Sequence, residues 1–516
     1  MADKIKFTEE LDASYQFQGA AITLGAGMID GVCETNHFVK IPLKTLNRHG
    51  LIAGATGTGK TKSLQLLAEG LSANGIPTLL MDIKGDLSGI AKSGAMNPKI
   101  EERIKKIGTL WSPSTFPVEL LSLSDQPGIK LRATTSEFGP VLLSKILDLN
   151  ETQQGILAMI FKYCDDKKLP LLDLEDLKKV IQYITGDGKN EIEKDYGAIS
   201  TVSAGTILRK VIELEQQGAA GFFGEPSFDP NDLLRTDNTG KGFINIIRLT
   251  DIQDRPKLFS TFMLSLLAEV YNSFPEIGDA EKPKLVIFID EAHLIFNDAS
   301  KQLLDQLETT IKLIRSKGVG VIFCTQNPQD IPSAILGQLG LKIQHALRAF
   351  TAADRKTIKT AAENFPESTY YKTDELLTQL GIGEALVTAL NEKGIPTMLT
   401  ATMMCSPASR MDVLSDNEIN ELVQASLLTR VYNQVLDRES AFEMLNRRMQ
   451  DTNEEDEKDN DSKSEKKKIT KEAPGTFEKI LKSPVVKAVG VSVAGLLTRS
   501  LLGSLGLKSR SRTTKR

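Results

Sequence analysis

The chain has 516 residues, of which 41% are hydrophobic and 25% are charged, and its formal net charge is −4. This is ordinary globular composition with enough apolar material for a large core, and it excludes binding to polyanions through bulk charge, although a basic channel remains compatible with it. The scattered cysteines argue against a disulfide framework and a zinc site. With no apolar signal region and no apolar run that could span a bilayer, the sequence predicts a cytoplasmic protein.

Residues 1–48 contain short apolar runs separated by Gly25, Gly27 and Gly31. We expect this part to be a short N-terminal β segment, because its runs are too short to build a domain. A buried strand over residues 51–53 and a helix over residues 61–73 follow, with a glycine-rich loop between them.

The glycine-rich loop reads G-x-x-x-x-G-K-T, a pattern typical of a phosphate-binding loop when a strand precedes it and a helix follows. Its glycines permit turns that a Cβ would forbid, so that backbone N–H groups and the helix N-terminus face phosphate oxygens. Lys60 is expected to reach the β- and γ-phosphates of ATP, and the Thr61 hydroxyl to hold Mg²⁺. The predicted nucleotide-binding residues are Gly54, Ala55, Thr56, Gly57, Thr58, Gly59, Lys60 and Thr61.

The next predicted strand, over residues 78–82, ends in Asp82, and Asp86 follows shortly after it. Ligands of parallel α/β sheets bind at the carboxyl ends of the strands, so these carboxylates are candidates to face the nucleotide or a neighbouring subunit. An ordinary polar turn after the strand explains them equally well.

Apolar residues then recur at helical spacing from about residue 139 to residue 218. This pattern predicts a helical insertion, which we assign to residues 136–235. It would separate the two halves of the core, residues 49–135 and residues 236–405.

A fully apolar strand is predicted over residues 285–289, and it ends in Asp290 and Glu291. Such a strand is typical of the centre of a parallel sheet that is covered on both faces. Two adjacent carboxylates beside a buried strand need a partner, and a metal ion is the natural one. Asp290 is therefore expected to hold Mg²⁺ as the Walker B aspartate, and Glu291 to orient and deprotonate the attacking water.

Another buried strand, ending at Gln326, is predicted to bring this amide near the γ-phosphate, where it can sense the phosphate or position water. Beyond it, the pattern predicts a strand over residues 343–350 that carries Arg348. Residues 385–389 and 398–401 flank a turn signal and predict a hairpin.

Two arginines are candidates for an arginine finger, because phosphoryl transfer concentrates negative charge that a guanidinium can meet bidentately. They are Arg348 and Arg315, and either could act within its own subunit or across a subunit boundary. A surface salt bridge is the alternative for each.

The C-terminal part of the sequence changes character twice. Residues 406–452 are expected to form C-terminal helices, and residues 453–483 a charged, disordered linker. Residues 484–516 combine an apolar stripe with a basic end. This amphipathic basic tail could bind a protein partner, a membrane surface or a nucleic acid, or dock on the protein itself.

Taken together, the glycine loop, residues 82–89, residues 290–293 and residues 325–328 resemble the motifs of the HerA/FtsK superfamily of P-loop ATPases, and most closely those of HerA-like, YjgR-type proteins. The resemblance covers roughly residues 45–405. It implies a RecA-like core, ATP hydrolysis, and a ring, typically a hexamer, with active sites at subunit boundaries. Better-studied members pump or unwind duplex DNA. Gln326 matches the glutamine of the family, and the finger maps to Arg348 or Arg315.

Residues 290–293 also spell Asp-Glu-Ala-His, the box of a helicase superfamily with two RecA-like cores. The residues after about 405 are too few and too polar to supply a second core, so this spelling does not decide the class. The predicted fold is α/β, with a RecA-like P-loop NTPase core of mostly parallel strands, helices on both faces and a helical insertion.

The leading functional hypothesis is a Mg²⁺-dependent ATPase that assembles as a homo-oligomeric ring, a hexamer by resemblance, and moves DNA. The alternative keeps the ATPase but has the ring act as a regulatory or scaffolding device on a protein or membrane partner, recruited through the C-terminal tail. Stimulation of ATP turnover by DNA distinguishes the two.

Overall fold

The computed structural model describes residues 3–450 except residues 252–254, 279, 297–300, 435 and 437. The linker and tail expected over residues 453–516 lie outside the described residues. The described residues divide into two compact units, residues 3–131 with 228–434, and residues 132–227 with 436 and 438–450.

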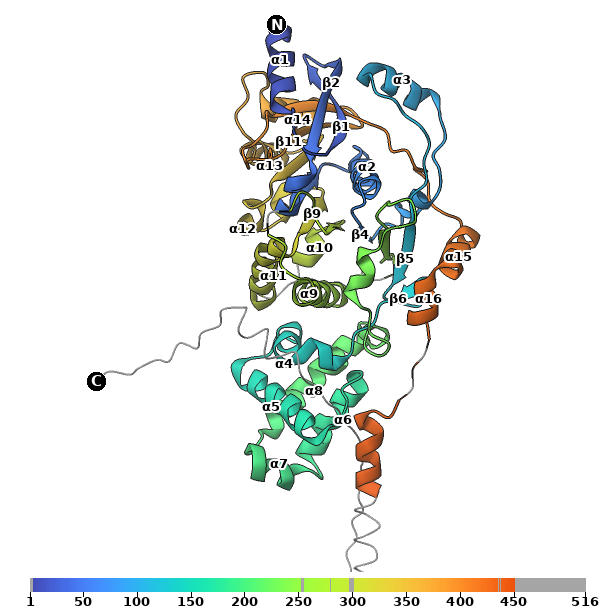
Figure 1. The fold of residues 1–516 in the computed structure, drawn as a ribbon. Helices are drawn as coiled ribbons and strands as arrows, with labels where there is room; N and C mark the ends of the chain where they lie inside the picture. Colours follow the sequence, from blue (N-terminus) through green and yellow to red (C-terminus); the bar gives the residue numbers. More distant parts are fainter. Residues whose placement is uncertain are drawn as a thin grey trace, which may run out of the picture. The chain divides into compact units, whose positions relative to one another are not determined.

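A mixed sheet of twelve strands forms the centre of the first unit, in the order β2-β1-β12-β11-β10-β3-β9-β8-β4-β7-β5-β6 (Figure 1). The strands from β10 to β6 in this order are parallel, and the remaining pairs are antiparallel. The strands are β1 (Ala21–Ile29), β2 (Val32–Pro42), β3 (Gly50–Ala53), β4 (Thr78–Asp82), β5 (Val118–Ser122), β6 (Ile129–Lys130), β7 (Ile244–Arg248), β8 (Leu285–Ile289), β9 (Val319–Thr325), β10 (Leu341–His345), β11 (Glu384–Thr388) and β12 (Thr400–Met404).

Helices pack on both faces of this sheet, as alternate residues of β9 demonstrate. Ile322 belongs to the same core as Leu64 of α2, whereas the ring of Phe323 lies 5.9 Å from that of Phe296 in α10. A parallel strand covered on both faces is apolar throughout, which explains the continuous apolar runs of β8 and β9. The predicted α/β core is confirmed. The helices of this unit are α1 (Lys4–Ser14), α2 (Lys60–Ala73), α3 (Pro98–Ile107), α9 (Pro256–Ser273), α10 (His293–Phe296), α11 (Lys301–Ile314), α12 (Ser333–Leu336), α13 (Ala352–Ala362), α14 (Thr373–Gln379), α15 (Asp416–Ala425) and α16 (Leu427–Tyr432).

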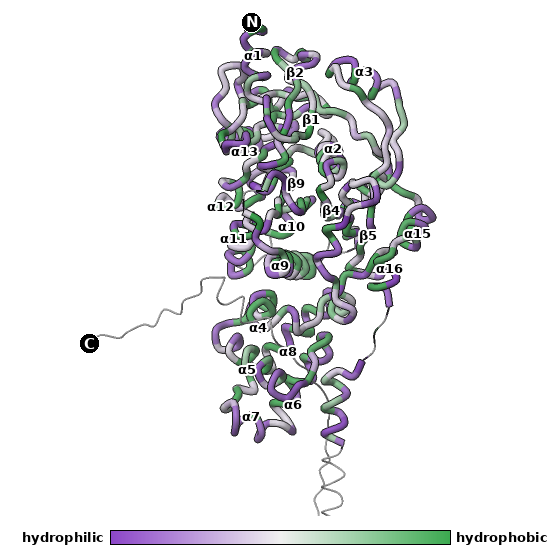
Figure 2. Tube along the Cα trace, viewed as in Figure 1, coloured by the Kyte–Doolittle hydropathy of each residue, from purple (hydrophilic) through white to green (hydrophobic). Residues whose placement is uncertain are grey.

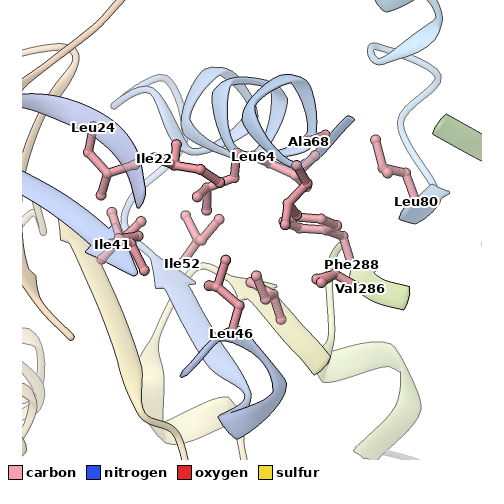
Figure 3. Close-up of a cluster of buried hydrophobic side chains, with 14 of the residues drawn as sticks. Ile22, Leu24, Ile41, Leu46, Ile52, Leu64, Ala68, Leu80, Val286 and Phe288 are labelled. Carbon is pink, nitrogen blue, oxygen red and sulfur yellow. The ribbon is translucent and has the colours of Figure 1, made fainter. Parts of the chain in front are cut away.

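A cluster of buried apolar side chains packs α2 against the sheet (Figure 3). Ile52, Leu64, Ala68, Leu80 and Phe288 are buried in it. Burying one large apolar side chain stabilises a fold by about 1.5–3 kcal/mol, so this cluster holds α2 firmly.

On α9, apolar residues run along most of the helix (Figure 2).

The N-terminal residues contribute a helix as well as strands. The sequence pattern predicted only strands before residue 48, whereas α1 precedes β1 and begins at the N-cap Asp3. Phe7, Leu11 and Tyr15 are buried at four-residue spacing. That spacing marks one helix face and was the available signal for this helix. The strands β1 and β2 join the antiparallel edge of the sheet.

The second unit is built from helices. Capping boxes start three of them, at Thr134, Asn150 and Asp173. The rings of Phe222 and Phe223 lie 5.8 and 4.8 Å from that of Phe138 in its core. The helices of this unit are α4 (Thr135–Ile146), α5 (Glu151–Lys167), α6 (Leu174–Thr185), α7 (Lys189–Tyr196) and α8 (Thr201–Gln216), and residues 441–450 are also helical.

Candidate nucleotide site

The glycine-rich loop connects β3 to α2 at the carboxyl end of β3. Gly54, Gly57 and Gly59 have φ angles of 150°, 77° and 117°, which favour glycine. A Cβ on Gly54 would lie 2.6 Å from the His345 side chain, but a Cβ on Gly57 would meet nothing within 4 Å. The loop is therefore packed on one side and open over Gly57, as a backbone cradle for phosphate must be.

Lys60 is the first residue of α2 and is buried. Its Nζ donates hydrogen bonds to the carbonyl oxygens of Gly54 (2.7 Å) and Ala55 (3.3 Å), which holds the ammonium group against the loop. Burial lowers the pKa of Lys60, and the nearby Lys84 lowers it further. These carbonyl oxygens carry only partial negative charge, so a bound phosphate would be a stronger partner for the Lys60 ammonium group. Thr61 lies half-buried in the first turn of α2, and Thr56 is exposed.

A turn at residues 382–383 supports the loop from behind. The Gly383 N–H donates to the Thr58 carbonyl at 2.9 Å, and a Cβ on Gly59 would lie 3.2 Å from the Gly383 Cα. Arg103 of α3 holds this turn in place. Its guanidinium donates to the carbonyls of Gly383 (2.9 Å), Ile382 (3.0 Å) and Met404 (3.0 Å). Arg103 thus acts on the phosphate loop through the Gly383 backbone.

Removing this guanidinium should loosen the loop without touching the nucleotide. Hydrogen bonds from charged groups contribute about 1.5–3 kcal/mol each, but Arg103 is only half-buried and water replaces part of the loss. We therefore expect Arg103→Ala to weaken nucleotide affinity roughly three- to tenfold. Titration of a fluorescent ATP analogue measures this affinity. The control is Lys99→Ala, which changes an exposed residue of the same helix. An Arg103→Ala affinity equal to that of Lys99→Ala would contradict the support role.

His345 lies beneath the loop and is fully buried. Its Nδ1 is 2.8 Å from the Glu384 carbonyl, which can only accept, so Nδ1 carries the proton. Its Nε2 is then free to accept from the Ser63 hydroxyl, at 2.9 Å. Burial lowers the pKa of His345 to about 4. This neutral imidazole joins α2, β10 and β11, and no sequence pattern had singled it out as a support of the loop.

Acid should therefore destabilise the protein through His345. Its folded pKa is below the unfolded value of about 6.5, so its stabilising contribution is present above pH 6.5 and is lost as the pH falls toward 4. Between pH 7.5 and 5 this group alone should cost about 2 kcal/mol of unfolding free energy. We expect His345→Gln to flatten the pH dependence by that amount in denaturant titrations. An unchanged slope would refute the assignment of a buried neutral imidazole.

The two predicted carboxylates lie at the carboxyl end of β8. Asp290 and Glu291 are each 5% exposed. Burial raises the pKa of Asp290 to about 6, and Lys84 opposes that shift. The Glu291 backbone is left-handed, with φ of 43°, which is unfavourable for a residue with a Cβ. The Ala292 N–H anchors this bend on the Cys324 carbonyl, at 2.9 Å.

The Glu291 carboxylate has one oxygen paired and one oxygen without a hydrogen bond. Lys84 pairs with Oε1, and Nδ1 of His293 lies 3.3 Å from Oε2 without hydrogen-bond geometry. Burial opposes the charge on Lys84, but the hydrogen bond and charge of Glu291 raise its pKa. A buried carboxylate oxygen without a donor has free capacity to accept a proton or a hydrogen bond. The sequence patterns had assigned no role to Lys84.

Asp82 belongs to a turn. Its carboxylate accepts hydrogen bonds from the backbone N–H groups of Gly85 (2.7 Å), Asp86 (3.1 Å) and Leu87 (3.1 Å). Of the two interpretations left open for this residue, the geometry supports the polar turn. That turn places Lys84 beside Glu291.

Gln326 directly follows β9 and is exposed. Because β9 lies between β3 and β8 in the sheet, Gln326 lies between the glycine-rich loop and the two carboxylates. Asp330 fixes the backbone beside it, accepting from the Thr325 hydroxyl and from the Asn327 N–H (3.1 Å).

The two arginines lie at opposite ends of the parallel strands, Arg348 beyond the carboxyl ends and Arg315 before the amino ends. The strand predicted to carry Arg348 is wrong in extent, since β10 ends at His345. The chain leaves the sheet there because the Ala346 carbonyl accepts from the Ala55 N–H (2.9 Å) and the Leu347 N–H donates to the Leu377 carbonyl (2.9 Å). Arg348 is exposed at the carboxyl edge, near the loop. Arg315 is exposed before β9, at the amino ends of the strands and away from the glycine-rich loop of its own chain.

The glycine-rich loop after β3, the two carboxylates after β8 and the glutamine after β9, which lies between these strands, agree with a match over residues 30–510 to the family described as "Helicase HerA-like C-terminal". The chain belongs to this HerA-like family. It is a P-loop ATPase of the HerA/FtsK type.

Relatives of this HerA-like chain are distant. The DNA double-strand break repair helicase HerA of Sulfolobus acidocaldarius is 22% identical over 395 residues, covering 75% of this chain and 71% of that protein. A probable helicase of Methanocaldococcus jannaschii is 34% identical over 295 residues, covering 50% of this chain and 55% of the relative, so the match spans about half of each. The plasmid coupling protein TrwB in complex with ADP and Mg²⁺ shares the fold, with a TM-score of 0.50 at 15% identity over 79% of this chain and 94% of that one.

In the part of the HerA-like chain that the structure describes, every helix is too short or too polar to cross a membrane.

Proposed function

We propose that this protein is a Mg²⁺-dependent ATP hydrolase that assembles as a ring and drives the movement of DNA. One observation carries the hydrolase part of the proposal. The strand order β3-β9-β8 brings the glycine-rich loop, Gln326 and the Asp290–Glu291 pair to one edge of the sheet, in adjacent positions.

The residues at this edge fit Mg²⁺ and ATP. Positive φ angles at Gly54, Gly57 and Gly59 shape a cradle, and Lys60 supplies a positive charge within it. Thr61 and Asp290 would hold Mg²⁺, which would offset negative charge on the phosphates. TrwB, which shares the fold, binds ADP and Mg²⁺.

Hydrolysis needs a base for water and an amide near the γ-phosphate. Glu291 is suited to be the base, because its Oε2 is buried and accepts no hydrogen bond. Lys84 keeps the other oxygen in place. Gln326 is suited to position water, since it is exposed between the loop and Glu291.

The positions of the two arginines are compatible with a ring, in which a finger of one subunit could meet the nucleotide of its neighbour. Arg348 lies at the carboxyl ends of the strands, beside the nucleotide site of its own subunit, whereas Arg315 lies at the amino ends and could contact the nucleotide of a neighbouring subunit.

If Arg315 is the finger, mixing Lys60→Ala with Arg315→Ala subunits should restore turnover, because some sites then combine an intact loop with an intact finger. If the finger is Arg348 within its own subunit, mixing Lys60→Ala with Arg348→Ala restores none.

DNA as the polymer moved is supported by the relatives. One is named a DNA double-strand break repair helicase, and another a DNA import protein. The test is ATP turnover by the purified chain with and without duplex and single-stranded DNA, at low and moderate salt. We expect DNA to raise turnover, and the rise to shrink with salt because phosphate contacts release counterions.

Turnover that is indifferent to DNA would overturn the DNA part of this proposal. It would favour an ATP-driven regulatory or scaffolding ring that acts on a protein or membrane partner. Deletion of residues 484–516 would then be the next experiment.

A further inference from the structure

An exposed aromatic residue lies four residues after the carbonyl that binds the glycine-rich loop. Phe350, between β10 and α13, is 87% exposed. A single exposed apolar side chain is common on proteins, so the charge and backbone around Phe350 decide whether it belongs to a binding surface.

The backbone presents Phe350 at a fixed position. The N–H groups of Phe350 and Thr351 donate to the Asp354 carboxylate at 2.8 and 2.7 Å, and the Asp354 N–H donates to the Thr351 hydroxyl at 3.1 Å. This capping box joins the residue to the start of α13. Phe350 therefore projects from an ordered turn.

Basic side chains surround the aromatic residue along the sequence. Arg348 precedes it, and Arg355, Lys356 and Lys359 lie on the exposed side of α13, because Ile358 and Ala361 face the core. Among the described residues, none of these four side chains forms an ion pair within 4 Å.

The acidic groups nearby leave this charge largely uncompensated. Asp354 is engaged in the capping box, and on the neighbouring α14 Glu375 pairs with Lys372. Asp374 is the other carboxylate on α14, Glu363 directly follows α13, and Glu367 lies between the two helices. The surface formed by residues 348–359, which we call the Phe350 surface, combines an aromatic ring with net positive charge.

This surface is connected to the nucleotide site at two points. The Ala55 N–H of the glycine-rich loop donates to the Ala346 carbonyl, at 2.9 Å. The Gln329 side chain, three residues after Gln326, donates to the Thr357 carbonyl of α13, at 3.0 Å. These two hydrogen bonds tie the segment that carries Phe350 to the glycine-rich loop and to the residues that follow Gln326.

We propose that the Phe350 surface binds single-stranded DNA, with the Phe350 ring stacked on a base and Lys356 and Lys359 at the phosphates. An aromatic ring stacks on any base, and cations beside it track the backbone, which is the chemistry of sequence-independent single-strand binding. The proposal rests on the proposed function and adds to it the surface that contacts the polymer.

The test is binding of a fluorescein-labelled oligothymidylate to the full-length protein with a non-hydrolysable ATP analogue, measured by anisotropy over a range of salt. Phe350→Ala should weaken binding about tenfold without changing the salt slope, because stacking is uncharged. The Phe350→Trp variant should keep the DNA affinity of the wild type, because tryptophan can also stack on a base. The Phe350→Leu variant should bind as weakly as Phe350→Ala. The double variant Lys356→Ala/Lys359→Ala should reduce the slope of log K against log salt by about 1.4, since two phosphate contacts are lost.

Leu110→Ala serves as the matched control, because Leu110 is 99% exposed and lies elsewhere on the unit. Phe350→Ala binding equal to that of Leu110→Ala would overturn the proposal while leaving the proposed function intact. Full affinity of the Phe350→Leu variant would also overturn the proposal. A Phe350→Ala variant that binds DNA normally but changes its oligomeric state would overturn it too, because the surface would then be a contact between subunits. Failure of the wild-type protein to bind any DNA would overturn both proposals.

Discussion

Replacing Glu291 with glutamine should reduce ATP turnover by about 10²–10⁴-fold while leaving nucleotide affinity near that of the wild type. Glutamine has the shape of glutamate but cannot take a proton from water. Its amide oxygen can still accept from Lys84, the partner of Oε1. Single-turnover hydrolysis and titration of a fluorescent ATP analogue measure the two quantities separately.

Glu119→Gln is the matched control for this prediction. Glu119 is also buried and also pairs with a cation, Arg235, but it lies on β5, far along the sheet order from β8. The control should hydrolyse ATP at the wild-type rate. Wild-type hydrolysis by Glu291→Gln would show that another group activates water, and the assignment of Glu291 as the base would be wrong.

Replacing Lys60 with alanine should weaken ATP binding on the order of a hundredfold. In the part of the chain that the structure describes, the buried ammonium group hydrogen-bonds only to carbonyl oxygens, and a phosphate would give it a stronger, charge-assisted bond. Loss of a hydrogen bond between charged groups costs about 1.5–3 kcal/mol, so one or two such bonds account for this factor. Calorimetric or fluorescence titration with Mg-ATP measures the affinity directly.

Lys62→Ala provides the comparison, since Lys62 lies close by on the same helix. Its ammonium group donates to the Met411 carbonyl, at 2.6 Å, outside the glycine-rich loop. Lys62→Ala should bind ATP nearly normally. Equal affinity of the Lys60 and Lys62 variants would place the phosphates somewhere other than the loop.

The main site elements could be predicted because each is local in sequence. The glycine-rich loop needs positive φ at fixed spacing, and only glycine meets that need readily. The apolar strands β8 and β9 are covered on both faces, so their polar ends, Asp290 and Gln326, marked the carboxyl edge of the sheet.

The supports of the site could not be predicted, because they depend on contacts between distant parts of the chain. Arg103 reaches Gly383 across 280 positions, and Ser63 reaches His345 across 282. The pairing of Lys84 with Glu291 follows from the β4–β8 neighbourhood, which no local pattern specifies. The strand assigned to Arg348 was too long because apolar residues continue after His345, while the backbone turns away to bind Ala55.

The measurement that tests the central claim most directly is single-turnover hydrolysis of ATP by the purified chain, in Mg²⁺ and in excess chelator. We predict hydrolysis that requires Mg²⁺ and is lost in both Lys60→Ala and Glu291→Gln, with the nucleotide still bound by the latter. Tight ATP binding without hydrolysis by the wild-type protein, in Mg²⁺ and in the presence of DNA, would contradict the assignment of this site as a hydrolase.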